Sequence, residues 1–303
     1  MALNKDDILL ESGTNELEVI MFGVGEGLFG INVLKVREII NPLPIVAVPN
    51  SHKYVEGIIN LRDEVIPVIN LAHVLNIKNS KTPEQDKFIV TELNQVKIAF
   101  RVHHILRIHR FSWKDIEKPD ELSSGQQTYA IGYSKIEEDV VILLDFEKVI
   151  VEINPQLGVN VEKLKELGER ERSEKQLVIA EDSAVLRHLL KDTLEEAGYH
   201  RLKLFENGQE AWEYLHHLSS EENINPIDEV NLIITDIEMP QMDGHHLTEK
   251  VKSNSRLKDI PVIIFSSLIT DDLFHKGETV GASAQVSKPQ IVDLVQTIDK
   301  YIL

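Results

Sequence analysis

The sequence predicts two domains, a β-rich and barrel-like domain followed by an α/β domain with a doubly wound parallel sheet. Three observations predict this fold class. The chain has 303 residues, which is long for a single hydrophobic core. Its first half contains many short apolar runs that are separated by turn residues. Its carboxy-terminal part alternates such runs with segments in which apolar residues recur at helical spacing.

The first domain is predicted over residues 1–153, and its pattern of short apolar runs predicts consecutive strands over most of its length. Residues 17–22 and 28–36 flank three closely spaced glycines, which predicts a β-hairpin. One helical turn is expected at residues 71–75. The other predicted strands are residues 54–61, 65–71, 88–92, 96–102, 105–109 and 140–144. Many strands with short connections favour a barrel-like fold.

Residues 54–71 are predicted to form a β-hairpin with a charged tip at Arg62–Asp63–Glu64. Pro67 lies in the second strand of this hairpin. Because proline has no N–H group for a sheet ladder, it indicates an edge strand or a bulged strand. On its own, the hairpin indicates a binding module, and its residues do not specify a target.

A linker is predicted over residues 154–174. Pro155 and Gly158 interrupt regular structure, and the charged stretch that follows offers only Leu164 and Leu167 for burial. This pattern is also compatible with a short helix inside the linker.

The second domain is predicted over residues 175–303 and alternates strands with helices. After its first strand, leucines recur at helical spacing until Gly198 ends the helix. The predicted strands are residues 177–180, 202–205, 232–235, 262–265 and 284–287. Five strands that alternate with helices predict βαβ units and a five-stranded parallel sheet.

Polar side chains follow four of these five strands. Glu181 and Asp182 follow the first, Asp236 the third, Ser266 the fourth and Lys288 the fifth. In doubly wound sheets, ligands bind beyond the carboxyl ends of the strands, so these side chains are expected to converge.

The chemistry of this set points to phosphoryl transfer. Carboxylates at close range repel one another and require a cation, and oxygen ligands suit Mg²⁺. The ion would neutralise a phosphate that approaches Asp236, whose carboxylate attacks phosphorus. Lys288 would bind the phosphoryl oxygens, and the Ser266 hydroxyl would donate a hydrogen bond to one of them. The expected metal ligands are Glu181, Asp182, Asp236 and the backbone carbonyl of Glu238.

The second domain resembles response-regulator receiver domains over residues 176–303. Four strings carry the resemblance in the usual order and spacing: IAEDS, IITDIEMPQMDG, PVIIFSS and GASAQVSKP. The resemblance implies a flavodoxin-like fold, Asp236 as the phosphoacceptor and a phosphohistidine of a sensor kinase as the donor. The sequence departs from the family at Gln285, where an aromatic residue usually reports phosphorylation by its rotation.

The first domain resembles CheW-like chemotaxis coupling domains over about residues 16–150. The strings are FGINVLKVREII, VPNSHKYVEGIINLRDEVIPVINL, IVTELNQVKIAFRVHHILRIHRF, SWKDIEKP and VVILLDFEKVI. The resemblance implies two small β-barrels that bridge chemoreceptor tips to a histidine kinase, with partner-docking surfaces at Val36, Glu38 and Arg62. An ordinary solvated surface is the alternative for Glu38 and Arg62. Asp63 departs from the family, which most often has glycine there.

A coupling domain followed by a receiver resembles the architecture of CheV-type chemotaxis proteins. This implies a non-enzymatic, cytoplasmic scaffold associated with receptor arrays, with coupling or adaptation tuned by phosphorylation of Asp236. The alternative is a phosphate sink that drains the kinase and hydrolyses its own acyl phosphate.

Composition argues against several other function classes. The chain contains no cysteine, which excludes disulfides and thiolate sites. Its net charge of −18 disfavours nucleic acid and acidic membrane surfaces as partners, and no helix-turn-helix or basic patch is visible. No apolar run is long enough to cross a bilayer, so direct membrane insertion is not expected.

Overall fold

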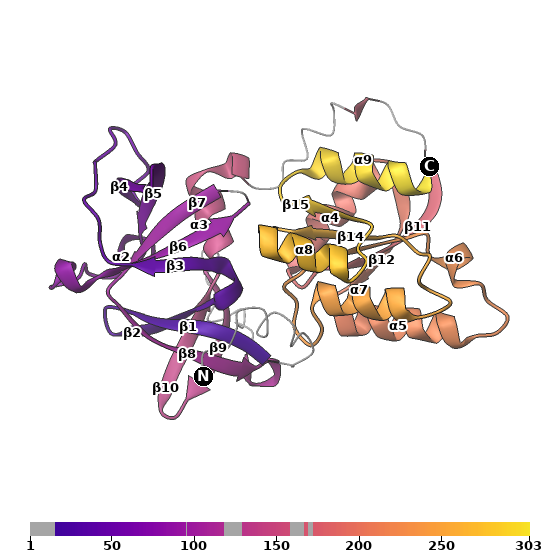
Figure 1. Cartoon of the computed structure of the whole chain (residues 1–303), viewed down its shortest axis with the longest axis horizontal. Helices are drawn as coiled ribbons and strands as arrows, with labels where there is room; N and C mark the ends of the chain where they lie inside the picture. The colour runs from indigo at the N-terminus through magenta and orange to yellow at the C-terminus, as the bar shows by residue number, and fades with distance from the viewer. Residues whose placement is uncertain (1–15, 95, 118–128, 158–166, 169–171) are drawn as a thin grey trace. The chain divides into compact units, whose positions relative to one another are not determined.

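The structure is a computed structural model that describes residues 16–94, 96–117, 129–157, 167–168 and 172–303. The chain divides into two compact units (Figure 1). One unit spans Glu16–Gly158, and the other contains residues 172–303. Each unit has hydrophobic cores of its own. None of the described helices is long and apolar enough to span a membrane.

The first sheet of the first unit has the strand order β8-β1-β2-β10-β9. Its strands are β1 (Glu16–Val24), β2 (Gly27–Asn32), β8 (His104–Ser112), β9 (Ala130–Ile136) and β10 (Asp139–Leu144). β1 and β2 pair antiparallel, which confirms the predicted hairpin. A bridge between Glu117 and Tyr133 connects the segment after β8 to β9, so the two edges of this sheet approach each other.

The second sheet of this unit has the order β3-β6-β7-β5-β4. Its strands are β3 (Val36–Ile40), β4 (Val55–Leu61), β5 (Glu64–Asn70), β6 (Lys87–Leu93) and β7 (Val96–Val102). Ile59, Phe88 and Val90 belong to the core enclosed by this sheet. Arg62, directly after β4, forms an ion pair with Glu38 of β3, which again connects the two edge strands. Two curled sheets with separate cores confirm the predicted pair of small barrels.

Short helices complete the first unit. They are η1 (Val33–Lys35), α2 (Leu71–Val74), η2 (Pro83–Gln85), η3 (Trp113–Asp115), α3 (Phe146–Ile153) and η4 (Pro155–Leu157). The helical turn predicted at residues 71–75 is α2. Helix α3 was not predicted, although Asp145 caps it by accepting a hydrogen bond from the Lys148 amide.

Two strand predictions need correction. The strand expected at residues 28–36 is divided by η1, because the Asn32 side chain accepts a hydrogen bond from the Leu34 amide and starts a turn. β9 was missed because its sequence is interrupted by glycine and polar residues. Gly132 has a packing reason there, since a Cβ atom at this position would lie 2.5 Å from Ile116.

β5 is not the edge strand that Pro67 indicated, because it lies between β7 and β4. Its pairing with β7 is limited to Val68–Asn70, so that ladder does not need an N–H group from Pro67. The bulge in this hairpin lies in β4, between Val55 and Gly57.

The second unit contains a parallel sheet with the order β12-β11-β13-β14-β15. Its strands are β11 (Ser173–Ala180), β12 (Tyr199–Phe205), β13 (Leu232–Thr235), β14 (Val262–Ser266) and β15 (Ala284–Ser287). All five predicted strands are therefore confirmed. β11 begins inside the segment predicted as a linker. Much of that segment, including most of the stretch suggested for a short helix, lies outside the described residues.

Helices cover both faces of this sheet, as the flavodoxin-like fold requires. They are α4 (Ala184–Glu196), α5 (Gly208–Ser220), α6 (Pro226–Glu229), α7 (Gly244–Ser253), α8 (Asp271–Thr279) and α9 (Ile291–Ile302). Leu177 and Ile179 of β11 pack in the core with residues of α4 and α9, whereas Val178 packs with residues of α5 and α7. Figure 1 shows α9 on one side of the sheet and α5 and α7 on the other.

Candidate functional site

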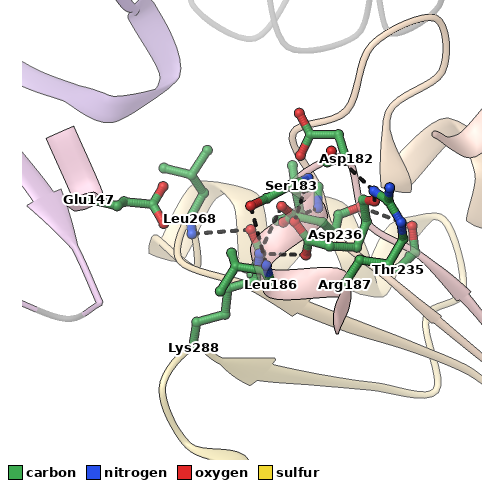
Figure 2. A network of polar contacts seen from close by, with 12 residues as sticks. Glu147, Asp182, Ser183, Leu186, Arg187, Thr235, Asp236, Leu268 and Lys288 are labelled. Carbon is green, nitrogen blue, oxygen red and sulfur yellow. Dashed lines mark hydrogen bonds and ion pairs between the residues drawn. The ribbon is translucent and has the colours of Figure 1, made fainter. Parts of the chain in front are cut away.

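The candidate phosphoryl site lies at the carboxyl ends of β11, β13, β14 and β15. Glu181 and Asp182 directly follow β11, and Asp236 directly follows β13. Ser266 is the last residue of β14, and Lys288 directly follows β15. Because the strands are parallel, these ends lie at one edge of the sheet (Figure 2).

A buried ion-pair network forms the centre of the site. The Lys288 Nζ atom lies 2.8 Å from Glu181 Oε2 and 2.9 Å from Asp236 Oδ2. The exposed fractions of Lys288, Glu181 and Asp236 are only 4%, 1% and 8%. Removal of the ammonium group would therefore leave carboxylates with little access to water.

The three carboxylates that follow β11 and β13 also converge on one another. Glu181, Asp182 and Asp236 each offer an oxygen, and these oxygens all lie within 4.8 Å of one another. Such a set of hard oxygen ligands fits a cation such as Mg²⁺.

The electrostatics of these acids are consistent with a need for positive charge. Burial raises the pKa of Glu181 to about 7; the nearby Lys288 opposes this shift and Asp236 adds to it. Burial raises the pKa of Asp182 well above its usual value, and the charges of Glu181, Asp236 and Glu238 raise it further. A bound divalent cation would favour the ionised form of each of these groups.

Backbone groups of neighbouring segments fix the position of Asp236. Its amide donates a hydrogen bond to the Ala180 carbonyl over 3.0 Å, and its Oδ1 accepts one from the Ile237 amide over 2.7 Å. Gly244 begins α7 so close to this segment that a Cβ atom would lie 1.9 Å from the Asp236 carbonyl oxygen. The sequence string IITDIEMPQMDG contains this glycine, but its role became visible only in the structure.

Ser266 and Lys288 are joined through the backbone. The Lys288 amide donates to the Ser266 carbonyl over 3.0 Å, and the Ser266 Oγ accepts from the Leu268 amide over 3.3 Å. A hydroxyl that accepts one hydrogen bond still has its own hydrogen to donate. The proposed contact of Ser266 with a phosphoryl oxygen stays a prediction, as does the metal contact of the Glu238 carbonyl.

Arg187 is a site residue that the sequence analysis missed. Its NH1 donates to the carbonyl oxygens of Glu181 and Asp182 over 2.7 and 3.2 Å, and its NH2 lies 3.0 Å from Glu206 Oε1. Arg187 lies in the first turn of α4, and long helical side chains extend back towards the helix amino terminus. It therefore binds the backbone of the acidic segment Glu181–Asp182 (Figure 2).

Gln285, the departure from the receiver pattern, binds helix α8. Its Nε2 donates to the Phe274 carbonyl over 2.7 Å, while its Oε1 is buried and has no hydrogen-bond partner among the described residues. A Cβ atom at Gly277 would lie 2.3 Å from Gln285, so glycine makes room for this side chain.

The structure brings together two of the three candidate partner-binding residues in the first unit. Arg62 NH2 lies 2.8 Å from Glu38 Oε2, and 78% of the Arg62 side chain is exposed. Val36 begins β3 and is half-buried. Arg62 and Asp63 have φ angles of 50° and 69°, so both central residues of this turn are left-handed. The roles of Val36, Glu38 and Arg62 in docking stay predictions.

Comparison with known families assigns both parts of the chain. Residues 18–154 match the CheW-like domain, and residues 177–299 match the response regulator receiver domain.

Two chemotaxis proteins of Helicobacter pylori match about nine tenths of this chain, and a third relative matches half of it. Chemotaxis protein CheV3 of Helicobacter pylori is 32% identical over 282 residues, which cover 91% of this chain and 89% of the relative. CheV2 of the same organism is 29% identical over 290 residues, with coverage of 90% and 89%. Chemotaxis protein CheW of Thermotoga maritima is 31% identical over 150 residues, or 50% of this chain and 98% of that protein.

Proposed function

Because the chain belongs to the CheV family of chemotaxis proteins, we propose that it couples chemoreceptors to a histidine kinase and that phosphorylation of Asp236 tunes this coupling. The observation that carries the regulatory part is the buried Asp236 carboxylate, which lies 2.9 Å from the Lys288 ammonium and beside two further acids. A scaffold of this kind is an adaptor and not an enzyme.

The coupling role belongs to the CheW-like domain, predicted over residues 1–153. Its proposed partners are the cytoplasmic tips of chemoreceptors and the histidine kinase of the pathway, in receptor arrays. Val36, Glu38 and Arg62 are the proposed contact residues. The exposed Arg62 guanidinium at the tip of a hairpin supports this role, because it is accessible to a partner.

Phosphorylation would proceed by attack of an Asp236 carboxylate oxygen on the phosphorus atom of a phosphohistidine. A P–O bond forms as the P–N bond breaks, and the imidazole leaves. Lys288 would exchange its contact with Asp236 Oδ2 for one with a phosphoryl oxygen. The Ser266 hydroxyl would donate its hydrogen to a second phosphoryl oxygen.

Mg²⁺ would be held by the carboxylates of Glu181, Asp182 and Asp236 and by the Glu238 carbonyl, and when bound it would neutralise the charge of the incoming phosphate. Arg187 keeps the backbone of Glu181 and Asp182 in place for this role.

Two routes could carry the signal to the coupling domain. In one, a Ser266 hydroxyl that turns towards the phosphoryl group weakens its contact with the Leu268 amide and shifts the segment that leads into α8. In the other, phosphorylation changes how the linker packs. The hydrogen bond of Ser266 with Leu268 supports the first route.

A phosphate sink is the second candidate function. The Gln285 side chain, bound to the Phe274 carbonyl, replaces the aromatic residue through which receivers usually report phosphorylation. In a sink, the receiver would remove phosphoryl groups from the kinase and then hydrolyse the acyl phosphate formed on its own Asp236. A phosphorylated half-life much longer than the signalling response would exclude it.

The regulatory role is tested by receptor-dependent kinase activity with the wild type and with Asp236→Ala. We expect both to support coupling, and only the wild type to change its coupling with phosphorylation. Asp259→Ala is the matched control, because it removes an exposed carboxylate of the same unit. Identical signalling and adaptation by wild type and Asp236→Ala would contradict the regulatory role.

A further inference from the structure

Helix α8 has little apolar anchorage in the second unit. Of its side chains that the structure describes, only that of Leu273 is buried, and Phe274 is 38% exposed. By contrast, α9 buries four apolar side chains in the core on one side of the same sheet. Elements with few buried apolar contacts open most easily, so the position of α8 depends strongly on individual polar contacts.

A glutamine of the edge strand β15 supplies one such contact. Gln285 Nε2 donates a hydrogen bond to the Phe274 carbonyl over 2.7 Å. The same amide group fits against the backbone of Gly277, because a Cβ atom there would lie 2.3 Å from Gln285 Oε1. Phe274 and Gly277 are three residues apart and therefore lie on the same face of α8. The glutamine and the glycine form a matched pair between β15 and α8.

This contact is weaker than an ordinary hydrogen-bonded pair. Gln285 Oε1 is buried and has no hydrogen-bond partner in the described part of the chain. A buried acceptor without a donor is unfavourable, which offsets part of the gain from the bond with Phe274. When α8 moves away, water reaches both polar atoms of the amide. The contact can therefore open at a small cost in free energy.

Both halves of this contact lead directly to the phosphoryl site. Lys288 follows Gln285 by three residues, and its amide donates to the Ser266 carbonyl. On the other side, α8 begins five residues after Ser266, whose Oγ accepts a hydrogen bond from the Leu268 amide. A displacement of the segment that contains Leu268 would reach the first turn of α8, and with it the Phe274 carbonyl.

We propose that Gln285 and Gly277 form a latch that holds α8 against β15 and releases it when Asp236 is phosphorylated. The holding part rests on the contacts of Gln285 with α8 alone. The release rests on the proposed function, because it requires a phosphoryl group on Asp236. The regulated contact is then a hydrogen bond between a side-chain amide and the backbone of a helix.

Hydrogen exchange of the α8 backbone amides in the full chain tests the holding part. Gln285→Glu keeps the size of the side chain, but its carboxylate cannot donate to the Phe274 carbonyl at neutral pH. We expect α8 to exchange faster by roughly twofold to fivefold, since a hydrogen bond is lost. Gln209→Glu is the matched control, because it makes the same change on α5, where Gln209 donates to Glu213. It should leave α8 exchange unchanged.

A double-mutant cycle tests whether Gly277 belongs to the latch. Added to Gln285→Ala, Gly277→Ala should slow α8 exchange by about fourfold to fivefold, because alanine favours a helix over glycine. In the wild-type background, the new methyl group collides with Gln285, so the same change should slow exchange by less than about twofold or speed it. Equal effects in both backgrounds would overturn the proposal, as would wild-type exchange in Gln285→Glu or an equal effect of Gln209→Glu.

A measurement on the wild type covers the case in which a variant does not fold. The side-chain amide protons of Gln285 should exchange with solvent more slowly than those of the exposed Gln209, and equal rates would overturn the latch.

The release is tested with acetyl phosphate and Mg²⁺, where acetate leaves as the P–O bond to Asp236 forms. Phosphorylated protein should show faster α8 exchange and lose the protection of the Gln285 amide. A phosphoryl group on Asp236 with unchanged α8 exchange would overturn this inference alone. No phosphoryl group on Asp236 would contradict the proposed function and the release together, while the variants would still decide whether the latch holds α8.

Discussion

Two ion pairs, one in each unit, have the same length and very different surroundings. Lys288 lies 2.8 Å from Glu181, and Arg62 lies 2.8 Å from Glu38. The side chains of the first pair are 5% and 2% exposed, whereas those of the second are 78% and 26% exposed. Distance alone therefore says little about the energetic importance of a pair, and burial decides how costly the loss of one partner is.

The largest effect is expected for Lys288→Met. This change leaves Glu181 and Asp236 buried without their counter-charge, so the free energy of unfolding should fall by about 3–5 kcal/mol. Urea unfolding at pH 8 with a chelator measures it. A loss below about 1 kcal/mol, as expected for an exposed pair, would show that water or protonation relieves the buried charges.

The second prediction concerns the pH dependence of stability that arises from Glu181. Burial raises its folded pKa from 4.5 to about 7, so the folded state binds more protons than the unfolded state between these values. Stability is retained below about pH 4.5 and falls as the pH rises through about 7, by roughly 3 kcal/mol. The substitution Glu181→Gln removes this pH-dependent contribution to the free energy of unfolding.

The measurement is the difference in the free energy of unfolding between wild type and Glu181→Gln, determined without divalent cations from pH 4 to 8. The wild type should become less stable relative to the variant as the pH rises, and added Mg²⁺ should reduce the difference. A difference that is constant with pH would argue against a raised pKa of Glu181.

A smaller effect is expected for Arg187→Met, which removes the hydrogen bonds to the carbonyls of Glu181 and Asp182. Mutation of a residue that orients metal ligands typically lowers the metal affinity by about 10–100-fold. The affinity for Mg²⁺ should therefore fall by about this factor. A Mg²⁺ titration of the wild type and the variant measures it, and Lys191→Met on the outer side of α4 is a control. Equal affinities would limit Arg187 to a structural role.

The smallest effect is expected for Arg62→Met in the exposed pair. The free energy of unfolding should change by less than about 1 kcal/mol, because water already screens both charges. Comparison with Lys288→Met under identical conditions sharpens the contrast between the two units. A loss of about 3 kcal/mol or more would mean that the pair with Glu38 holds the edges of its barrel together.

The second unit was predictable because the topology fixes where its candidate site residues lie. Once five parallel strands are recognised, the ends that carry Glu181, Asp236 and Lys288 must share one edge. Arg187 could not be found in this way, since its partners are backbone carbonyls whose position depends on how α4 begins. The contact of Gln285 with α8 likewise depends on the absence of a side chain at Gly277, where a Cβ atom would clash with Gln285.

The first unit was less predictable because its important contacts join residues that are distant along the chain. The pairing of Glu38 with Arg62 requires the second sheet to curl until its edges meet. The sequence around Asp86 looks like an ordinary charged loop, and its burial beside Arg101 follows only from the folded barrel. Alternating patterns identified most strands, but they could not show which edges close.

Phosphotransfer from a labelled histidine kinase, with Mg²⁺ and with a chelator, tests the central claim most directly. In the presence of Mg²⁺, the wild type and the control Asp259→Asn should acquire label, while Asp236→Asn should acquire none. When the chelator replaces Mg²⁺, the wild type and the control should acquire much less label. Equal labelling of Asp236→Asn and the wild type would contradict the assignment of Asp236 as the phosphoacceptor.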